Sequence, residues 1–526
     1  MFSMTFYSII IPAIVILLFQ FILWIIHRHR FLQTFKRAGI KGPKPNFLTG
    51  NIKLFDTQFV FNSLDGWFEK YGDVCGYFKG DRAVLVIKDI DLIQQVFIDR
   101  FVEFPNRFKF MINLKPFDSS VLALRDLRWR QIRRIISPAF NSLKTLNAND
   151  IILRSTQQLM SLLKEPSANQ SLYLMKENEK NRILIDITRM SKHFTLDIIC
   201  RYAFDIQNED FFDQNCPLFL GAEEIFSKSS DNFLIRLCLI VPWIKNMIEF
   251  ICNRITLGRM IDQLVHYFNI KLAKIEQSEK TSTLLQFILK QYKLKNLKRE
   301  EAIGNLLVIL LAGYETTANA IAFTLFNLAR NTEIQNYLRK SLDESTWNFE
   351  QSESQMKNEF LDRVIYESMR LYPPVTDFVI REPSDHISEF YELSFLNKQI
   401  KLDSHVAIQL PVWTLHHDPN LWPNPYKFDP SRDGLTCSPI STLSTDKHQR
   451  SRFFAFGLGQ RSCIGGNLAL AELRSVISAL VLQYKINIIP EKNYEFDKND
   501  MLKTMLIGEL MKPCENIWLE FIPIEQ

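Results

Sequence analysis

The sequence predicts a mainly α-helical protein with a small β-sheet portion, preceded by one transmembrane helix. Long segments carry apolar residues at helical spacing, whereas only a few short stretches have the composition of strands. The first 26 residues contain no charged side chain, so they are long and apolar enough to cross a bilayer. The chain has 526 residues, 47% hydrophobic and 23% charged, a balance that suits a large globular core.

Residues 1–26 are predicted to form a transmembrane signal-anchor helix. A cleaved signal peptide is disfavoured by the long apolar stretch and by the lack of basic residues before it, and a buried core helix is disfavoured by the apolarity of all its faces. The basic run His-Arg-His-Arg at 27–30 places the following chain in the cytosol by the positive-inside rule. Residues 27–45 indicate a basic and proline-rich linker, and a single domain is expected over 46–526.

The remaining segments fall into helices, strands and loops by their periodicity. Helices are predicted from apolar residues at helical spacing over 125–136, 182–204, 257–275, 299–330 and 360–371. Strands are predicted at 84–87, within 400–410 and around 517–521. The polar runs 343–358 and 436–450 are expected to be solvated loops or helix edges.

Composition narrows the classes of function. The formal net charge of +5 is mild, so it suits acidic partners or anionic membrane surfaces and gives no indication of nucleic-acid binding. The eight cysteines form no CxxC pair and have no regular spacing, which argues against a zinc site and against a disulfide framework. The motifs of phosphate loops, dinucleotide folds, zinc proteases and serine hydrolases do not occur in the sequence either.

One cysteine stands in a segment with the properties of a ligand-binding loop. The segment 456–465, Phe-Gly-Leu-Gly-Gln-Arg-Ser-Cys-Ile-Gly, places Cys463 among glycines just before a predicted helix at 467–482. Glycine allows positive φ and a close backbone approach to a flat ligand. Backbone N–H groups at a helix N-terminus lower a thiol's pKa and stabilise the thiolate that binds metal ions. Arg461 can pair with an anionic group. The alternative interpretation of the whole segment is a tight turn with a buried structural cysteine.

This segment resembles the cysteine-loop pattern FxxGxRxCxG of the cytochrome P450 family. It matches at every fixed position, which are Phe456, Gly459, Arg461, Cys463 and Gly465. The resemblance implies the cytochrome P450 fold, a haem b cofactor and Cys463 as the axial ligand of the haem iron. It also implies that Arg461 pairs with a haem propionate.

A second family motif lies upstream of the cysteine loop. Glu367 and Arg370 match the pattern ExxR, and their spacing puts both side chains on one helix face where they can pair. Alone, such a pair is usually a solvated surface ion pair. The resemblance implies that Arg432 completes a buried network with them, although Ser431 and Asp433 depart from the residues common in the family.

A third motif interrupts the predicted helix at 299–330. The run 312–317, Ala-Gly-Tyr-Glu-Thr-Thr, is similar to the family's oxygen-activation motif. A threonine inside an apolar helix can bond the carbonyl four residues back, here that of Ala312, and open space for a small ligand. The resemblance implies that Glu315 and Thr316 are catalytic and relay protons to dioxygen.

Further cofactor-binding residues are implied at two places. Trp129 and Arg133 match the family's WxxxR and share a helix face, so together they could hold a propionate. Arg381 stands near a third propionate-binding position, about one residue beyond the expected spacing. The segment 125–134 carries five arginines, which in the family face an acidic electron donor, and a solvated helix face is the alternative.

The resemblance implies a haem-thiolate monooxygenase that inserts one oxygen atom from dioxygen into an apolar substrate. It further implies a single-pass protein of the endoplasmic reticulum membrane, with electrons from the NADPH-cytochrome P450 reductase and in some cases cytochrome b5. An isomerase or dehydratase of peroxides and a non-catalytic haem-binding membrane protein are the alternatives. Fatty acid, sterol and xenobiotic substrates all stay open, as do the oligomeric state and the role of Asp377, a charge beside the expected pocket wall.

Overall fold

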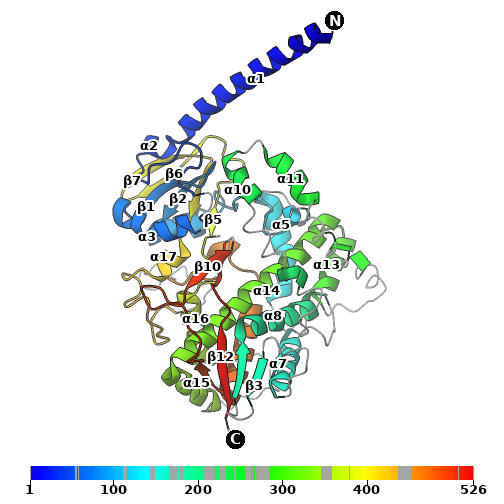
Figure 1. Cartoon of the computed structure of the whole chain (residues 1–526), viewed down its shortest axis with the longest axis vertical. Coiled ribbons are helices and arrows are strands. Elements are labelled where there is room, and N and C mark those ends of the chain that lie inside the picture. The colour runs from blue at the N-terminus through cyan, green and yellow to red at the C-terminus, as the bar shows by residue number, and fades with distance from the viewer. Residues whose placement is uncertain are drawn as a thin grey trace.

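The computed structural model describes residues 2–524 apart from a set of short segments. Those left out are 54–55, 57, 110–114, 142–147, 165–173, 178–181, 205–219, 224–232, 242–243, 255–261, 263–264, 267–268, 271–282, 345–357, 378, 436–451 and 508. Helices make up most of the body, and the small sheets lie toward two of its edges (Figure 1). The mainly α-helical class with a minor β portion is therefore confirmed.

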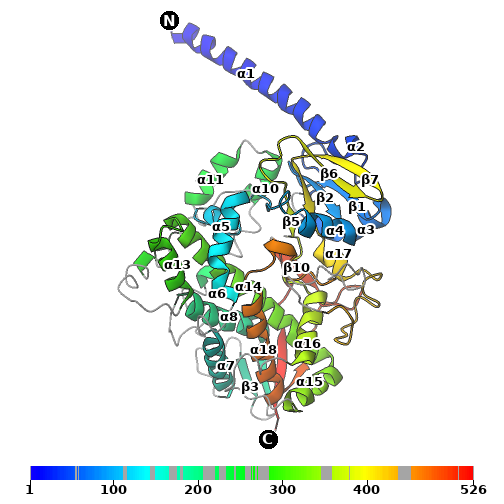
Figure 2. The same cartoon turned by 180° about the vertical axis from the view of Figure 1, so that it is seen from behind.

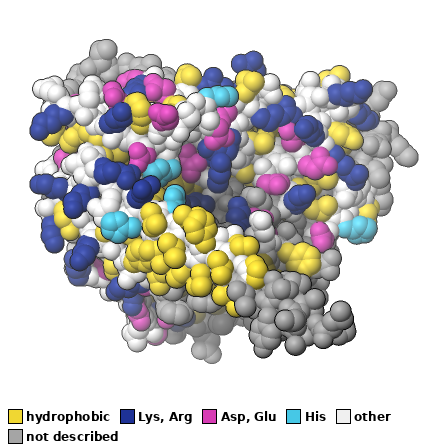
Figure 3. Space-filling model, turned by 90° about the horizontal axis from the view of Figure 1, so that it is seen from above, with side chains coloured by type: hydrophobic (Ala, Val, Ile, Leu, Met, Phe, Trp, Pro, Cys, Tyr) yellow, Lys and Arg dark blue, Asp and Glu magenta, His cyan; other side chains and the backbone are white. Residues whose placement is uncertain are grey.

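The N-terminal helix α1 (Phe2–Phe31) extends away from the body (Figure 1). Its exposed apolar side chains gather in one patch when the molecule is seen from that end (Figure 3). Among the described residues, Ile14–Phe31 passes the length and hydropathy test for a membrane span and is 6% buried. The other helix that passes, Arg299–Arg330, is 83% buried, which is expected for the core helix of a globular domain.

Helix α1 continues past the expected boundary at residue 26 and ends against the body. A short helix α2 (Thr34–Arg37) follows. Phe31 packs edge-on against Phe78, and Phe35 packs against the same ring at a tilt. Residues at the start of the expected linker are thus folded onto the domain, because their aromatic side chains are apolar enough to join its core.

The first sheet lies beside this junction and has the strand order β1-β2-β8-β5. Strands β1 (Val74–Phe78) and β2 (Ala83–Ile87) are antiparallel, β2 is parallel to β8 (Val406–Gln409), and β8 is antiparallel to β5 (Ile380–Arg381). Every residue of β1, β2, β8 and β5 is buried, which explains their nearly continuous apolar sequences. The hairpin β6–β7 and helices α3 and α4 cover the sheet; their bounds are Phe390–Phe395, Lys398–Asp403, Phe59–Tyr71 and Ile90–Gln94.

The helical body is built around α14 (Arg299–Arg330), which is buried along nearly its whole length. It packs against α8 (Ile187–Phe204), α16 (Glu359–Leu371) and α18 (Gly466–Gln483), as Figure 2 shows from behind. Further helices surround this group: α5 (Asp126–Ile136), α6 (Pro138–Asn141), α7 (Ala148–Lys164), α10 (Phe233–Ile240), α11 (Lys245–Arg254), α13 (Leu284–Lys293), α15 (Thr332–Glu344) and α17 (Val412–His416).

The second sheet has the order β3-β4-β12-β9 and lies at the end of the body near the C-terminus (Figure 1). Its strands are β3 (Leu174–Glu177), β4 (Arg182–Asp186), β12 (Trp518–Pro523) and β9 (Tyr484–Ile488). A separate hairpin, β10 (Thr504–Ile507) with β11 (Leu510–Pro513), reaches the middle of α14, where the Asn319 side chain donates to Met511 O at 3.0 Å.

Most predicted elements are found, with two corrections. The helices predicted at 125–136, 299–330 and 360–371 and the strands at 84–87 and 517–521 are confirmed to within a few residues. The segment 400–410 is not one strand, because a turn at 404–405 divides it between β7 and β8, which belong to different sheets. The segment 182–204 is not one helix, because residues 182–186 pair with β12 as a strand before α8 begins. The predicted loop 436–450, most of the loop 343–358 and most of the predicted helix 257–275 lie outside the described residues.

Candidate active site

The cysteine loop is a tightly bonded turn that ends at the N-terminus of α18. Cys463 N donates to Phe456 O at 2.8 Å, and the loop contains a 3₁₀ turn at Gly459–Arg461. Gly459 has φ of +69°, and a Cβ there would come within 2.2 Å of Phe97 O. Only glycine fits at this position, so the sequence pattern has a direct steric cause.

The Cys463 side chain is exposed, although the two residues before it, Arg461 and Ser462, are buried. Burial raises the pKa of this thiol, while the Gly465 backbone N–H, Arg133 and Arg107 act to lower it. The helix terminus and the arginines thus act in the expected direction, but desolvation outweighs them and the pKa of the thiol is raised overall. Exposure together with desolvation describes a side chain that faces an enclosed space rather than the outer surface. A Cβ on Gly465 would meet nothing within 4 Å, so there is open space beside the backbone two residues after Cys463 as well.

Four arginines surround the cysteine loop. Arg107 and Arg133 donate to the carbonyls of Arg461 and Ser462, each at 2.9 Å, and Arg381 donates to Leu458 O at 3.2 Å. Arg461 itself donates to the carbonyls of Pro105, Val121 and Leu124 and lies 3.8 Å over the Trp129 ring. The structure thus brings Trp129, Arg133, Arg381 and Arg461 together, as the sequence predicts.

The positive charge of this group is poorly compensated. Burial, followed by repulsion from Arg107, Arg381 and Arg133, lowers the pKa of Arg461 to about 7, and burial lowers the pKa of Arg107 to about 10. Within the described part of the chain, Arg133, Arg381 and Arg461 form no salt bridge, and the buried Nε of Arg381 has no hydrogen-bond partner. Several buried cations without a carboxylate fit a ligand with two anionic groups, such as the propionates of haem.

Helix α14 presents a small accessible face in the middle of a buried stretch. Ala312 is exposed and Gly313 and Thr316 are partly exposed, while their neighbours on both sides are buried. The Thr316 hydroxyl donates to Ala312 O at 2.7 Å, which confirms the predicted bond to the carbonyl four residues back. A flat ligand above Cys463 would meet small side chains and one hydroxyl on this helix.

Glu315 points away from that face. Its carboxylate is buried against α8, where Lys192 Nζ lies 3.3 Å from Glu315 Oε1, and Oε2 has no partner among the described residues. Adjacent residues of a helix point in directions about 100° apart, and here Thr316 lies on the accessible face while Glu315 faces α8. The structure therefore does not bring the two predicted catalytic side chains together.

The predicted network on α16 forms as a buried set of ion pairs. Arg370 contacts both Glu367 oxygens, at 2.7 and 2.9 Å, and Arg432 Nε donates to Glu367 Oε1 at 3.0 Å. Glu367 also accepts from Asp429 N at 3.0 Å. The side chains of Glu367 and Arg370 are fully buried. Loss of any one partner in this network would therefore leave a buried charge uncompensated, which is costly in free energy.

His416 joins this network to the cysteine loop, and sequence reasoning missed it. Arg370 Nη1 donates to His416 O at 2.6 Å, and His416 Nε2 accepts from Phe454 N at 2.8 Å, two residues before Phe456. Burial, with His417 and Arg370 nearby, lowers the pKa of His416 well below its usual value, so the ring is the neutral acceptor that this bond requires. Arg107 was also missed, because a single arginine in a loop has no periodicity to single it out.

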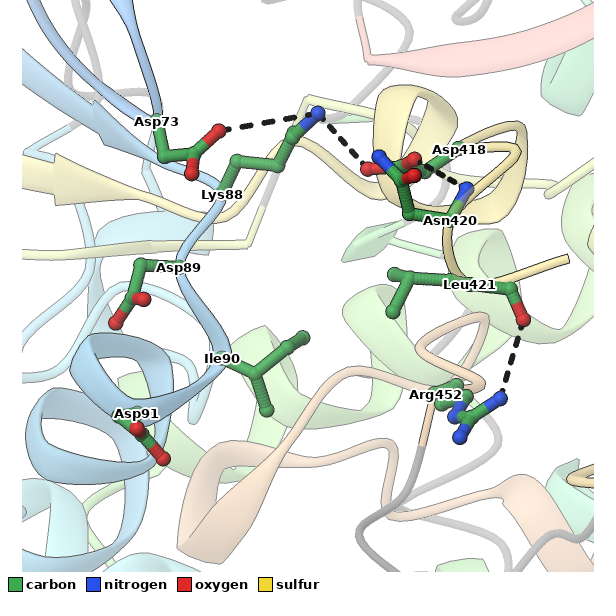
Figure 4. A pocket seen from close by; sticks show the side chains of 9 residues that line it. All are labelled: Asp73, Lys88, Asp89, Ile90, Asp91, Asp418, Asn420, Leu421 and Arg452. Atoms are coloured by element: carbon green, nitrogen blue, oxygen red, sulfur yellow. Dashed lines mark hydrogen bonds and ion pairs between the residues drawn. The ribbon is translucent and has the colours of Figure 1, made fainter. Parts of the chain in front are cut away.

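A separate surface pocket of about 320 Å³ lies on another part of the molecule (Figure 4). Its walls hold Lys88, which bridges Asp418 at 2.8 Å and Asp73 at 3.9 Å, and Arg452, which donates to Leu421 O. None of the residues predicted from the motifs lines it, so it is not part of the candidate active site.

Comparison with known proteins agrees with this geometry. The Cytochrome P450 family model matches residues 40–514. Cytochrome P450 3A30 of Fundulus heteroclitus is 25% identical over 505 residues, which cover 93% of this chain and 94% of that protein. Thromboxane-A synthase of Rattus norvegicus is 27% identical over 507 residues, 87% of this chain and 88% of that protein. Cytochrome P450 3A27 of Oncorhynchus mykiss is 25% identical over 491 residues, with coverages of 89% and 88%.

Proposed function

Because the chain belongs to the cytochrome P450 family, whose members bind haem b through a cysteine thiolate, we propose that it is a monooxygenase with Cys463 as the ligand of the haem iron. It inserts one oxygen atom from dioxygen into an apolar organic substrate such as a fatty acid, a sterol or a xenobiotic. The observation that carries the proposal is the exposed Cys463 thiol just before α18, with Arg133, Arg381 and Arg461 close to the loop and in no salt bridge among the described residues. When bound, the haem supplies the site of dioxygen activation, which thiolate ligation favours.

The residues around the loop have different roles toward the haem. The propionates would be held by Arg133, Arg381 and Arg461. The Trp129 ring stacks against the Arg461 guanidinium and supports it. Phe456, Gly459 and Gly465 shape the loop so that the thiol faces the ligand. Glu367, Arg370 and Arg432 fix the segment that leads into it.

Proton delivery uses α14. The Thr316 hydroxyl lies on the accessible face and is held by Ala312 O, so it can pass a proton toward the ligand side. Glu315 is paired with Lys192, so it can take part in proton delivery only when this salt bridge is open.

Helix α1 anchors the protein in the endoplasmic reticulum membrane, with the catalytic body in the cytosol. Its apolar length and the basic residues that follow it support this orientation. Electrons come from the NADPH-cytochrome P450 reductase, with cytochrome b5 as a second donor. Of the five arginines at 125–134, Arg125, Arg128 and Arg133 are bound to groups of this chain, which leaves Arg130 and Arg134 to face an acidic donor.

The test is a carbon monoxide difference spectrum of the reduced full-length protein, compared with Cys463→Ser. A strongly red-shifted Soret band in the wild type that is lost in the variant is expected. Cys514→Ser is the matched control, since Cys514 is also exposed but lies next to β11, and it should keep the band. Wild-type protein without haem, or with a band typical of histidine ligation, contradicts the proposal.

A second candidate is a haem-thiolate isomerase or dehydratase that rearranges peroxides without dioxygen or a reductase. Two observations favour it: several relatives are named thromboxane-A synthase, and Glu315 is turned away from Thr316. Turnover of a lipid hydroperoxide in the absence of NADPH and reductase would support it. Turnover that requires both would support the monooxygenase.

A further inference from the structure

A short turn of residues 46–50 lies beside the end of α1. Its two central side chains, Phe47 and Leu48, are large and apolar, and they are 37% and 50% exposed. The Phe47 ring meets the Trp24 ring of α1 edge-on, with 5.8 Å between the ring centroids. The 46–50 turn thus holds two adjacent exposed apolar side chains against the apolar helix.

The contact with Trp24 sets the depth of the 46–50 turn relative to the membrane. The apolar sequence of α1 ends at Ile26 and basic residues begin at His27, so the hydrocarbon region of a bilayer crossed by α1 ends near this point. Trp24 lies in the last apolar turn of the helix, at the level where aromatic side chains gather at membrane surfaces. Because Phe47 touches Trp24, the tip of the 46–50 turn lies at the same level.

The backbone of the 46–50 turn is bonded to protein groups, as a segment in contact with lipid requires. Asn46 Oδ1 accepts from the N–H groups of Leu48 and Thr49, at 2.9 and 3.3 Å. Asn46 and Gly50 exchange backbone hydrogen bonds in both directions, at 2.7 and 3.0 Å. These groups need no water, so the tip can leave water with little loss of hydrogen bonding and can present its apolar side chains to lipid.

Arg28 ties the 46–50 turn to α1 and to the domain. Its guanidinium donates to the carbonyls of Phe47 and Leu48, at 2.8 and 3.0 Å. The same group donates to Gly80 O and to Asp81 Oδ1, each at 3.0 Å. Arg28 is buried, so these charge-assisted bonds are shielded from water. One side chain therefore fixes the end of the helix, the turn and the start of the sheet to one another, and it satisfies the two carbonyls at the tip.

The charges around the 46–50 turn suit a membrane surface. The sequence from His27 to Lys53 contains no Asp or Glu, and its basic residues Arg30, Lys41 and Lys44 are exposed. Positive charge next to an apolar contact is attracted to the anionic head groups of a cytoplasmic membrane face. An apolar tip flanked by basic side chains, at the base of a membrane helix, has the chemistry of a lipid contact.

We propose that the 46–50 turn enters the lipid interface beside α1 as a second membrane contact, and that Arg28 holds it at that depth. The partner is the phospholipid bilayer, whose acyl chains contact Phe47 and Leu48. This inference rests on the proposed function only in taking α1 as the membrane anchor. Two points of attachment fix the tilt of the body on the membrane, which a single helix does not.

The test is photo-crosslinking to lipid, with p-benzoylphenylalanine in place of Leu48. Haem-loaded full-length protein in nanodiscs of phosphatidylcholine and phosphatidylserine is irradiated, and lipid adducts on the protein are measured by mass spectrometry. The same probe at Ile22, which is exposed in the apolar part of α1, is the positive control. The probe at Tyr337 is the negative control, since this exposed residue lies on α15 at the other end of the body (Figure 1). Adducts are expected at Leu48 and Ile22 and not at Tyr337.

A second set of variants, all with the probe at Leu48, tests the role of Arg28. Arg28→Ala should lower the adduct yield several-fold, because the carbonyls of the 46–50 turn lose their donor and the turn separates from α1. Arg30→Ala is the matched control, since it removes the same charge from an exposed side chain two residues later, and it should keep the yield. Arg28→Lys keeps the charge without the planar fork of donors, so it should also lower the yield. It provides the reading if the melting curve shows that Arg28→Ala fails to fold.

The outcomes separate this inference from the proposed function. Adducts at Ile22 without adducts at Leu48, or adducts at Tyr337 as abundant as those at Leu48, overturn the lipid contact and leave the anchor standing. Missing adducts at both Ile22 and Leu48 contradict the anchor and the inference with it. A yield that is unchanged in the Arg28 variants overturns the role of Arg28. A missing thiolate-type carbon monoxide band together with the expected adducts contradicts the monooxygenase and leaves the lipid contact intact.

Discussion

Replacement of Glu367 by glutamine should destabilise the protein by about 3–5 kcal/mol, the usual cost of breaking a buried ion pair. Glu367 is fully buried and accepts four hydrogen bonds, from Arg370 Nε and Nη2, Arg432 Nε and Asp429 N. Glutamine keeps the shape, but it turns one oxygen into a donor that faces a guanidinium and leaves two buried cations without their anion. The free energy of unfolding, taken from denaturant titration of the full-length protein, measures the loss.

Glu359→Gln is the matched control for this prediction. Glu359 begins the same helix and pairs with Arg363 at 3.2 Å, but its side chain is 85% exposed. A solvated pair at this spacing contributes about 0.3–0.5 kcal/mol, so the control should be nearly neutral. A Glu367→Gln variant within about 1 kcal/mol of the wild type, or no worse than the control, would refute the reasoning that burial makes this network essential.

Two further predictions concern the surroundings of the cysteine loop. Gly459→Ala should destabilise the loop by more than about 1 kcal/mol and lower the haem content, because the new Cβ would stand at a residue with positive φ and would collide with Phe97 O. The control is Gly66→Ala in the middle of α3, where a Cβ has open space, and this variant should be neutral or stabilising. Equal haem content in both variants would contradict the steric argument. Burial, and then repulsion from Arg370, lowers the pKa of His417 to about 3. As the pH falls below about 6.5, His417 is therefore protonated in the unfolded chain while it stays neutral in the folded chain. Stability should fall as the pH drops from about 6.5 toward 3, and His417→Asn should flatten that part of the pH dependence of the unfolding midpoint; an unchanged slope would show that His417 is not responsible.

The helices that matter most could be predicted because their sequence patterns are long. The segment 299–330 repeats apolar residues at helical spacing over many turns, and its bounds were predicted to the residue. The strand at 182–186 could not be separated from the helix that follows it. Its alternation, with Ile183 and Ile185 buried, extends over only five residues and gains its meaning from pairing with β12, more than 300 residues later.

Motifs predicted which residues gather at the site but not how each side chain is directed. The cysteine loop, Trp129, Arg133 and Arg381 come together because each motif fixes a local turn or helix face. For Glu315 the motif gives a catalytic role beside Thr316 but no direction for the side chain. Its actual partner, Lys192, lies on another helix 123 positions earlier by sequence number, and no local pattern connects the two.

The basic residues after the anchor show how a targeting signal can also be a structural element. Arg28 is 2% exposed, and its guanidinium donates to the carbonyls of Phe47, Leu48 and Gly80 and to Asp81. A buried arginine with four partners cannot swing freely, so α1 meets the body at a fixed angle instead of through a flexible linker.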